Sequence, residues 1–277
     1  MAAEQDKYAV FVGINDYMEY EDEPGRDLQG AESDALLMRE VLIERWGLAE
    51  ANTLTLLSRE ATKAAIHLAI TEWLASRAGP DDLAIFYFAG HGAQAFDLDG
   101  DEPDGLDETL APTDILANSS ANDIRDDDFR MWLSTVPASA VVILDSCHSG
   151  TATRGSEMRT RSLERPLPPE DGNEPEAVRQ RFDRETMADG GASIVELAGA
   201  APNQSALEGS FPTGDGGIPA QHGAFTTYLV QKLRAATEST TYEEVMAAVA
   251  ARLLRDDLVQ VPQLTGAGAK ALFAPGR

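Results

Sequence analysis

The sequence predicts an α/β fold built on a mainly parallel sheet, and three observations lead to this prediction. Five short runs are mostly apolar: residues 8–14, 53–57, 83–88, 140–144 and 193–200. Runs of this kind suit strands buried on both faces of a sheet. Stretches with apolar residues at helical spacing separate several of them, and this alternation favours parallel strands joined by right-handed crossovers. Two of the runs end in polar, glycine-containing turns, AGHG at 89–92 and DSCHSG at 145–150.

The expected elements of the first part of the chain are, in order, a strand at 8–14, a polar loop at 15–30, a helix at 31–46, a strand at 53–57, a helix at 62–77 and a strand at 83–88. Gly47 is placed to end the first helix, because glycine readily adopts the left-handed conformation found after helices. Thr62 is a candidate N-cap for the second helix. Gly79 and Pro80 follow its end.

The remaining elements are an irregular region at 93–122, a short helix at 126–136, a strand at 140–144, an Arg-rich segment at about 151–191, a strand at 193–200, a Gly/Pro-rich loop at 202–221, helices at 224–236 and 242–254, and a last strand or edge at 259–264 and 271–273. The Arg-rich segment has four prolines and no apolar period, which is typical of a flexible linker.

Composition limits the class of protein. A net charge of −25 over 277 residues makes nucleic acid an improbable partner and favours cationic ones, such as basic peptide segments. The single cysteine excludes an intrachain disulfide and an all-cysteine metal site. We find neither a signal peptide nor an apolar run long enough for a membrane span, so we expect a cytoplasmic protein without a membrane partner.

The lone Cys147 and the distant His91 are a candidate nucleophile and proton-transfer partner. Each follows a predicted buried strand, and ligands of open α/β sheets bind where strands end. His148 is a weaker partner, because adjacent residues of an extended chain point apart. We expect His67, within an amphipathic helix, to be structural. His222 is a weak candidate for a loop near the cleft.

With these residues in place, the sequence resembles the caspase-like cysteine peptidases (peptidase family C14), in their prokaryotic metacaspase or orthocaspase branch. The resemblance is carried by YFAGHG at 87–92 and DSCHSG at 145–150, together with the acidic stretch at 99–108, QHGAFT at 221–226 and VPQL at 261–264. The spacing of 147 − 91 = 56 residues also fits, since caspases place the histidine about 50 residues before the cysteine.

The resemblance implies the caspase–hemoglobinase fold, a mainly parallel sheet of about six strands with helices on both faces. It implies one peptidase domain over residues 1–277, interrupted by the Arg-rich linker. It also implies an endopeptidase in which Cys147 attacks the peptide carbonyl and His91 transfers protons to the leaving amine. The backbone N–H groups of Gly92 and Cys147 would then hold the oxyanion, and no cofactor is needed for the chemistry.

Substrate specificity is predicted from two aspartates. Asp145 lies two residues before Cys147, and the resemblance pairs it with Asp34 as the residues that recognise a basic side chain before the cut bond. Two carboxylates in a partly desolvated pocket favour a bidentate guanidinium, so cleavage after Arg, with Lys second, is expected. The alternative is that Asp34 only begins a helix and Asp145 only orients a turn. Ala89 stands where metacaspases often have serine, so we expect the pocket to lack one of the family's hydrogen bonds.

The Arg-rich linker suggests autoprocessing. An exposed basic stretch just after the nucleophile is a natural substrate for an arginine-directed peptidase. The candidate cleavage residues are Arg154, Arg159, Arg161, Arg165, Arg179, Arg181 and Arg184. The alternative is a solvated linker that is not cut.

The acidic stretch raises the question of calcium. It does not fit an EF-hand, because the glycine required at the sixth position is Glu102. The resemblance instead implies a calcium site built from Asp107, Asp126 and Asp127. A further family ligand is replaced by Arg154, which disfavours a divalent ion. The other explanation is that turns and a helix N-terminus favour acidic residues.

Two other functions compete with an arginine-directed endopeptidase. One is a catalytically silent caspase-like module that binds partners through its acidic surface. The other is a caspase-fold peptidase of different specificity, such as cleavage after Asn or Asp. The expected partners of the first function are protein or peptide substrates with basic residues, and an upstream activating protein is a further candidate.

Overall fold

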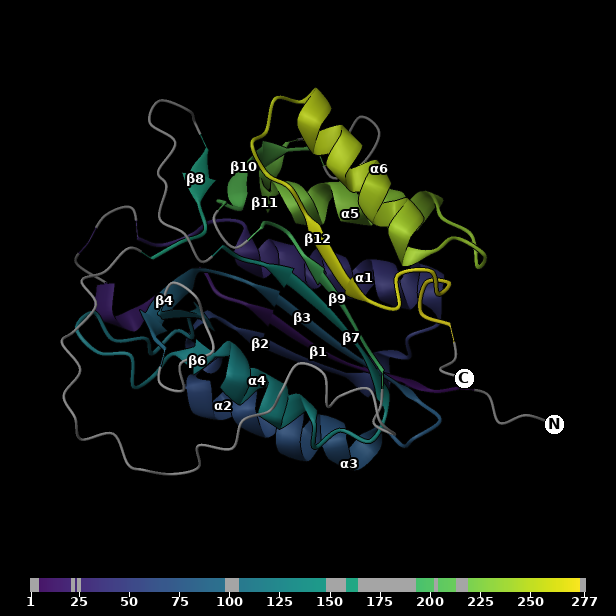
Figure 1. The fold of residues 1–277 in the computed structure, drawn as a ribbon, viewed down its shortest axis with the longest axis horizontal. Helices are drawn as coiled ribbons and strands as arrows, with labels where there is room; N and C mark the ends of the chain where they lie inside the picture. The colour runs from purple at the N-terminus through teal and green to yellow at the C-terminus, as the bar shows by residue number, and fades with distance from the viewer. Residues whose placement is uncertain are drawn as a thin grey trace.

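The computed structural model describes residues 5–20, 23, 26–97, 105–147, 158–163, 193–201, 204–212 and 219–274. Its centre is a six-stranded sheet, shown in Figure 1, with the order β12-β9-β7-β3-β1-β2. The strands are β1 (Lys7–Gly13), β2 (Thr53–Leu57), β3 (Leu83–Ala89), β7 (Ser139–Asp145), β9 (Ile194–Ala198) and β12 (Gln263–Gly266). All neighbours are parallel except β12, which runs antiparallel to β9. The predicted α/β fold with a mainly parallel sheet is thus confirmed.

Helices cover both faces of this sheet (Figure 1). One layer contains α1 (Ala31–Trp46), α5 (Ala224–Ala235) and α6 (Tyr242–Arg255). The other contains α2 (Lys63–Leu68), the π-helical segment η4 (Ala69–Leu74), α3 (Ala75–Arg77) and α4 (Asp126–Leu133). Because the central strands have no face in water, β3 is buried at every position. Among the described residues, no helix is both long enough and apolar enough to cross a bilayer.

Local sequence signals set several helix ends. Gly47 follows α1 with a φ of 70°, the left-handed conformation that glycine adopts at low cost. The Thr62 side chain accepts a hydrogen bond from the Ala65 N–H at the start of α2. Thr241 and Glu244 form a capping box before α6. Short 3-10 turns occur at η1 (Met18–Tyr20), η2 (Glu50–Asn52) and η3 (Ser58–Glu60).

The prediction that residues 93–122 are irregular is wrong in part. Strands β4 (Gly92–Phe96) and β5 (Leu106–Leu110) lie there and form a small antiparallel sheet with β6 (Ile124–Arg125). The acidic sequence between β4 and β5 hides this hairpin, since its strands show little apolar alternation.

The prediction of a loop over residues 202–221 is also wrong in part. It contains β10 (Leu207–Phe211), which pairs with β11 (Ala220–Gly223) on one side and with β8 (Arg159–Thr160) on the other. These strands are short and include glycine and charged residues, which depress any strand signal. The pairing with β8 means that part of the Arg-rich segment lies as a strand against the body of the protein.

Candidate active site

The ends of two neighbouring central strands bring Cys147 and His91 to one edge of the sheet. β3 and β7 are paired so that Ala89 lies opposite Asp145. His91 and Cys147 each stand two residues farther along. The strand register therefore places both residues just beyond the carboxyl ends of neighbouring strands, and their joint action stays a prediction.

His91 is held on both its ring and its backbone. Its ring Nε2 lies 2.6 Å from the carbonyl oxygen of Arg26. Because a carbonyl only accepts, Nε2 carries the hydrogen and Nδ1 has the free lone pair. The His91 backbone N–H donates to the hydroxyl of Tyr17 at 2.6 Å, and the two rings pack at 4.8 Å. Nδ1 is buried and has no hydrogen-bond partner among the described residues.

Cys147 is almost completely buried, at 1% exposure, and its Sγ lies 3.8 Å from the carbonyl oxygen of Ala206. Its backbone N–H donates to the carbonyl oxygen of Arg161 at 3.2 Å. The N–H of Gly92 donates to the same oxygen at 3.0 Å. The two backbone groups expected to hold an oxyanion thus converge on one peptide carbonyl, that of Arg161.

We call residues 158–163 the bound segment, because they lie along this edge as an extended chain. β8 within it pairs antiparallel with β10, so that Thr160 lies opposite Leu207. The N–H of Arg161 continues the ladder by donating to the Ala206 carbonyl at 2.9 Å. Main-chain pairing with a strand edge is a common way for proteins to bind an extended peptide.

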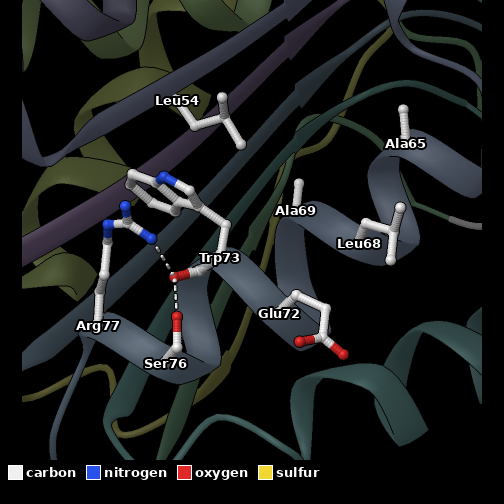
Figure 2. A pocket seen from close by; sticks show the side chains of 8 residues that line it. All are labelled: Leu54, Ala65, Leu68, Ala69, Glu72, Trp73, Ser76 and Arg77. Atoms are coloured by element: carbon white, nitrogen blue, oxygen red, sulfur yellow. Dashed lines mark hydrogen bonds between the residues drawn. The ribbon is translucent and has the colours of Figure 1, made fainter.

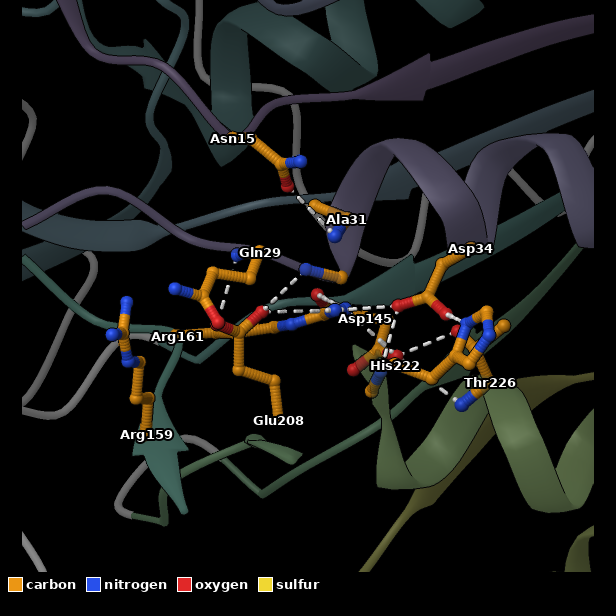
Figure 3. Close-up of polar contacts among 12 residues, drawn as sticks. Asn15, Gln29, Ala31, Asp34, Asp145, Arg159, Arg161, Glu208, His222 and Thr226 are labelled. Carbon is orange, nitrogen blue, oxygen red and sulfur yellow. Dashed lines mark hydrogen bonds and ion pairs between the residues drawn. The ribbon is translucent and has the colours of Figure 1, made fainter. Parts of the chain in front are cut away.

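The side chain of Arg161 fills a pocket formed by Asp34, Asp145 and Glu208, which we call the carboxylate pocket (Figure 3). Its Nη2 lies 2.5 Å from Asp34 Oδ2 and 3.6 Å from Glu208 Oε2. Its Nη1 lies 3.0 Å from Asp145 Oδ2. All four side chains have no exposed surface. The two aspartates predicted to recognise a basic residue do converge on a guanidinium.

Neighbouring groups fix the aspartates of the carboxylate pocket. Asp34 accepts from the N–H of Gly223 and lies 2.7 Å from the ring Nδ1 of His222. Asp145 accepts from both the N–H and the hydroxyl of Thr226 at 3.2 and 2.6 Å. Residues from four separate elements, α1, β7, β11 and α5, are therefore held together around the guanidinium (Figure 3).

Glu208 is the third carboxylate, and it also accepts from the backbone N–H groups of Gln29 and Gly30 at 3.0 and 3.2 Å. It joins the loop before α1 to β10. Sequence reasoning missed it, because it lies in a stretch read as a loop and carries no motif. Tyr17 and the Arg26 carbonyl were missed too, since neither packing against a histidine ring nor a carbonyl contact leaves a sequence signal.

The electrostatics of the pocket depend on the guanidinium. Burial disfavours the charged guanidinium, but Asp145, Asp34 and Glu208 outweigh this effect and raise the pKa of Arg161 further. Burial also raises the pKa of Asp145, although Arg161 lowers it. Three carboxylates thus face one buried cation, and removing that cation leaves them uncompensated.

The other candidate residues lie elsewhere. The Arg159 side chain is exposed, and its Nη1 donates to the carbonyl oxygen of Asp27 at 2.9 Å. The His67 ring packs against Trp132 at 4.8 Å, as expected of a structural residue. His222 lies on β11 and contacts Asp34, not Cys147. The remaining candidates fall outside the described residues: His148, Arg154, Arg165, Arg179, Arg181 and Arg184.

The carboxylates of the expected calcium site contact arginines. Asp107 Oδ2 lies 3.0 Å from Arg125 Nε, while Asp126 and Asp127 lie 2.6 and 3.7 Å from Nη1 of Arg130. Burial raises the pKa of Asp107 to about 7, although Arg125 lowers it. Within the described part of the chain, no three His, Cys, Asp or Glu side chains are placed to hold a metal ion. Calcium binding at these carboxylates therefore stays a prediction, and we derive no step through it.

A separate hollow of about 610 Å³ lies on the helical layer of α2, η4 and α3 (Figure 2). Its apolar lining includes Trp73, Leu68 and Leu54, with Arg77 at one end. It contains neither the candidate catalytic residues nor the carboxylate pocket. The hollow is therefore separate from the candidate active site.

Comparison with known proteins agrees with this geometry. The caspase domain family, Peptidase_C14, matches residues 6–273. Metacaspase-1 of Schizosaccharomyces pombe is 36% identical over 152 residues, which cover 52% of this chain and 34% of that protein. Metacaspase-1 of Cryptococcus neoformans is 38% identical over 156 residues, covering 53% of this chain and 32% of that protein. The matches span about a third of the length of these relatives.

Solved structures extend the likeness over nearly the whole chain. Protein GSU0716 of Geobacter sulfurreducens superposes with a TM-score of 0.70 at 27% identity, covering 98% of this chain and 97% of that one. Caspase-1 of Spodoptera frugiperda superposes with a TM-score of 0.56 at 13% identity, covering 95% and 88%. The second likeness concerns the fold alone.

Proposed function

The chain belongs to the caspase domain family Peptidase_C14, a family of cysteine peptidases, and on that premise we propose that it cleaves peptide bonds after Arg, with Lys second, and cuts its own Arg-rich segment. One observation carries the proposal. Arg161 lies with its side chain in the carboxylate pocket and its carbonyl on the N–H groups of Gly92 and Cys147. This is the arrangement that a substrate needs before its bond is cut.

The chemistry follows from the contacts of the two candidate catalytic residues. Cys147 Sγ attacks the carbonyl carbon of Arg161, and its proton passes to Nδ1 of His91. The negative charge that develops on the carbonyl oxygen is stabilised by the backbone N–H groups of Gly92 and Cys147, and each such donor lowers the barrier by roughly 3 kcal/mol. His91 then gives the proton to the nitrogen of Ser162 as the C–N bond breaks. Water hydrolyses the remaining thioester and frees Cys147.

The proposed preference for arginine over lysine rests on how the three carboxylates are distributed around the guanidinium nitrogens. The two terminal nitrogens of Arg161 each face a different aspartate, and one of them also faces Glu208. A lysine carries one compact ammonium, which cannot span the same positions. An aspartate before the cut bond would meet three carboxylates and be repelled, so cleavage after Asp is disfavoured.

The bond expected to be cut is the one between Arg161 and Ser162. Of the seven candidate arginines, Arg161 has its side chain in the carboxylate pocket, while Arg159 is exposed and contacts a backbone carbonyl. Before this cut, the bound segment covers the active site, so that other substrates cannot reach it. This supports the proposal that the uncut chain is a zymogen.

The test is intact-mass analysis of the purified protein beside Cys147→Ala and Arg161→Gln. Wild type should yield two fragments that end and begin at Arg161 and Ser162, whereas Cys147→Ala should stay whole. Arg161→Gln should lose this cut. Arg161→Lys, which keeps the pocket charge, should be cut about tenfold or more slowly.

Peptide substrates complete the test. The processed wild type should cleave fluorogenic amides with Arg before the bond faster than those with Lys, and those with Asp not at all. Parallel assays with calcium and with a chelator show whether the ion matters. A wild type that remains as intact as Cys147→Ala and hydrolyses none of the amides would instead support the silent interaction module.

A further inference from the structure

Contacts with the body of the protein continue beyond the bond between Arg161 and Ser162. Gly92 uses both of its backbone groups on the bound segment. Its N–H donates to the Arg161 carbonyl at 3.0 Å, and its own carbonyl accepts from the Leu163 N–H at 2.9 Å. Ser162 lies between these contacts in a parallel bridge with Gly92. One glycine therefore aligns the chain on both sides of the bond.

The Leu163 side chain is buried, at 3% exposure, and it belongs to the main apolar core of the molecule. Ser162 is only half-buried. On the other side of the bond, the Arg159 side chain is exposed and contacts a backbone carbonyl. Many other residues could stand in place of Arg159 with little loss of binding. Beyond Arg161 itself, Leu163 is thus the most deeply buried side chain of the bound segment.

Burial of this kind discriminates among side chains, whereas the backbone contacts of Gly92 do not. Removing a leucine side chain from water favours binding by about tenfold or more over a residue that gains nothing. A charged side chain at the same place would lose its hydration without gaining a partner. The second position after the bond therefore contributes to substrate specificity, in addition to the arginine before the bond.

We propose that this protein has an S2′ subsite, the site for the second residue after the cut bond, which takes a large aliphatic side chain. Its substrates are then peptides with Arg before the bond and a leucine-like residue two positions after it. The inference rests on the proposed function, because it concerns the same cleavage. It adds a requirement that the carboxylate pocket alone does not impose.

Peptides test the subsite without altering the protein. Internally quenched peptides based on Arg-Thr-Arg-Ser-Leu are compared with versions that carry Ala or Glu in place of Leu, using the full chain after self-processing. We expect kcat/KM to fall about tenfold or more for Ala and further for Glu. A matched set that varies the third residue after the bond should differ little.

A fluorogenic arginyl amide, which has no residue at the S2′ position, separates this inference from the proposed function. If the amide is cleaved but the Leu, Ala and Glu peptides are cut at equal rates, the S2′ inference is wrong and the proposed function stands. If neither the amide nor any peptide is cut, both are wrong.

Self-cleavage provides a second measurement. Leu163→Glu should slow the cut between Arg161 and Ser162 about tenfold or more, while Leu163→Met, which keeps the volume and the apolar character, should leave it nearly unchanged. Equal rates in the two variants would overturn the inference. Should Leu163→Glu fail to fold, the peptide series decides the matter.

Discussion

Cys147 and His91 are both neutral in the uncut molecule. Burial raises the pKa of the Cys147 thiol to about 12 and lowers the pKa of His91 to about 4. The thiolate is therefore scarce while the bound segment covers the site, and attack on a carbonyl must be coupled to proton transfer between these two residues. A buried neutral pair protects the only cysteine of the chain from adventitious reaction before it is needed.

The low pKa of His91 predicts a pH dependence of stability. In the unfolded chain histidine binds a proton below about pH 6.5, whereas native His91 stays neutral down to about pH 4. The unfolded state then binds more protons, so stability falls as the pH drops from 6.5 to 4, by about 3 kcal/mol at most.

Denaturant unfolding of the uncut Cys147→Ala protein, with and without His91→Asn, measures this contribution. The free energy of unfolding should fall more steeply below pH 6.5 when His91 is present, and the difference between the two proteins should be constant from pH 7.5 to 8.5. Identical slopes in acid would show that His91 does not resist protonation.

Among the elements, β11 closes the carboxylate pocket at a glycine. A Cβ on Gly223 would overlap Asp145 Oδ2 and lie 2.7 Å from Nη1 of Arg161. The backbone N–H of the same residue donates to Asp34. The absence of a side chain at this position therefore leaves room for the guanidinium.

Gly223→Ala should slow self-cleavage and the hydrolysis of arginyl amides by at least tenfold, with a loss of stability of about 1–3 kcal/mol from overpacking. Gly79→Ala is the matched control, because its Cβ would meet only ordinary van der Waals contact, 3.4 Å from the Asp82 carboxylate. A time course of self-cleavage in both variants provides the measurement. A Gly223→Ala protein that cuts itself as fast as the control would contradict this account of the pocket.

The central strands could be predicted from the sequence, whereas the strands that border the site could not. β3 and β7 are buried runs that end in motifs, and their register places His91 and Cys147 at the same edge of the sheet. β10 and β11 are short, contain glycine, and gain their stability from each other and from β8. Such pairing depends on distant parts of the chain, so local pattern does not reveal it.

The same distinction separates the pocket residues that were predicted from those that were missed. Asp34 lies in the first turn of α1 and Asp145 ends β7, two elements that the sequence predicts, and both side chains contact Arg161. Glu208 reaches it through β10, which the sequence did not indicate. That Arg161, among seven arginines, lies in the carboxylate pocket follows from three-dimensional pairing and not from its neighbours in sequence.

For the molecule as a whole, the bound segment predicts that self-cleavage is intramolecular. The chain already lies in its own site, and tethered groups meet at effective concentrations of about the millimolar range, far above typical protein concentrations. The slowly cut Arg161→Lys variant should therefore show the same half-time over a hundredfold dilution. A half-time that lengthens in proportion to dilution would indicate cleavage between molecules.

The position of Arg161 in the chain also determines what happens after the cut. Arg161 lies 161 − 147 = 14 residues after Cys147, so it stays covalently joined to the half that carries the nucleophile. Hydrolysis gives it a terminal carboxylate beside the N–H groups of Gly92 and Cys147, which favour an anion. If the chain is cut here as proposed, its first product stays tethered beside Cys147, so that breaking the bond and vacating the site are separate events.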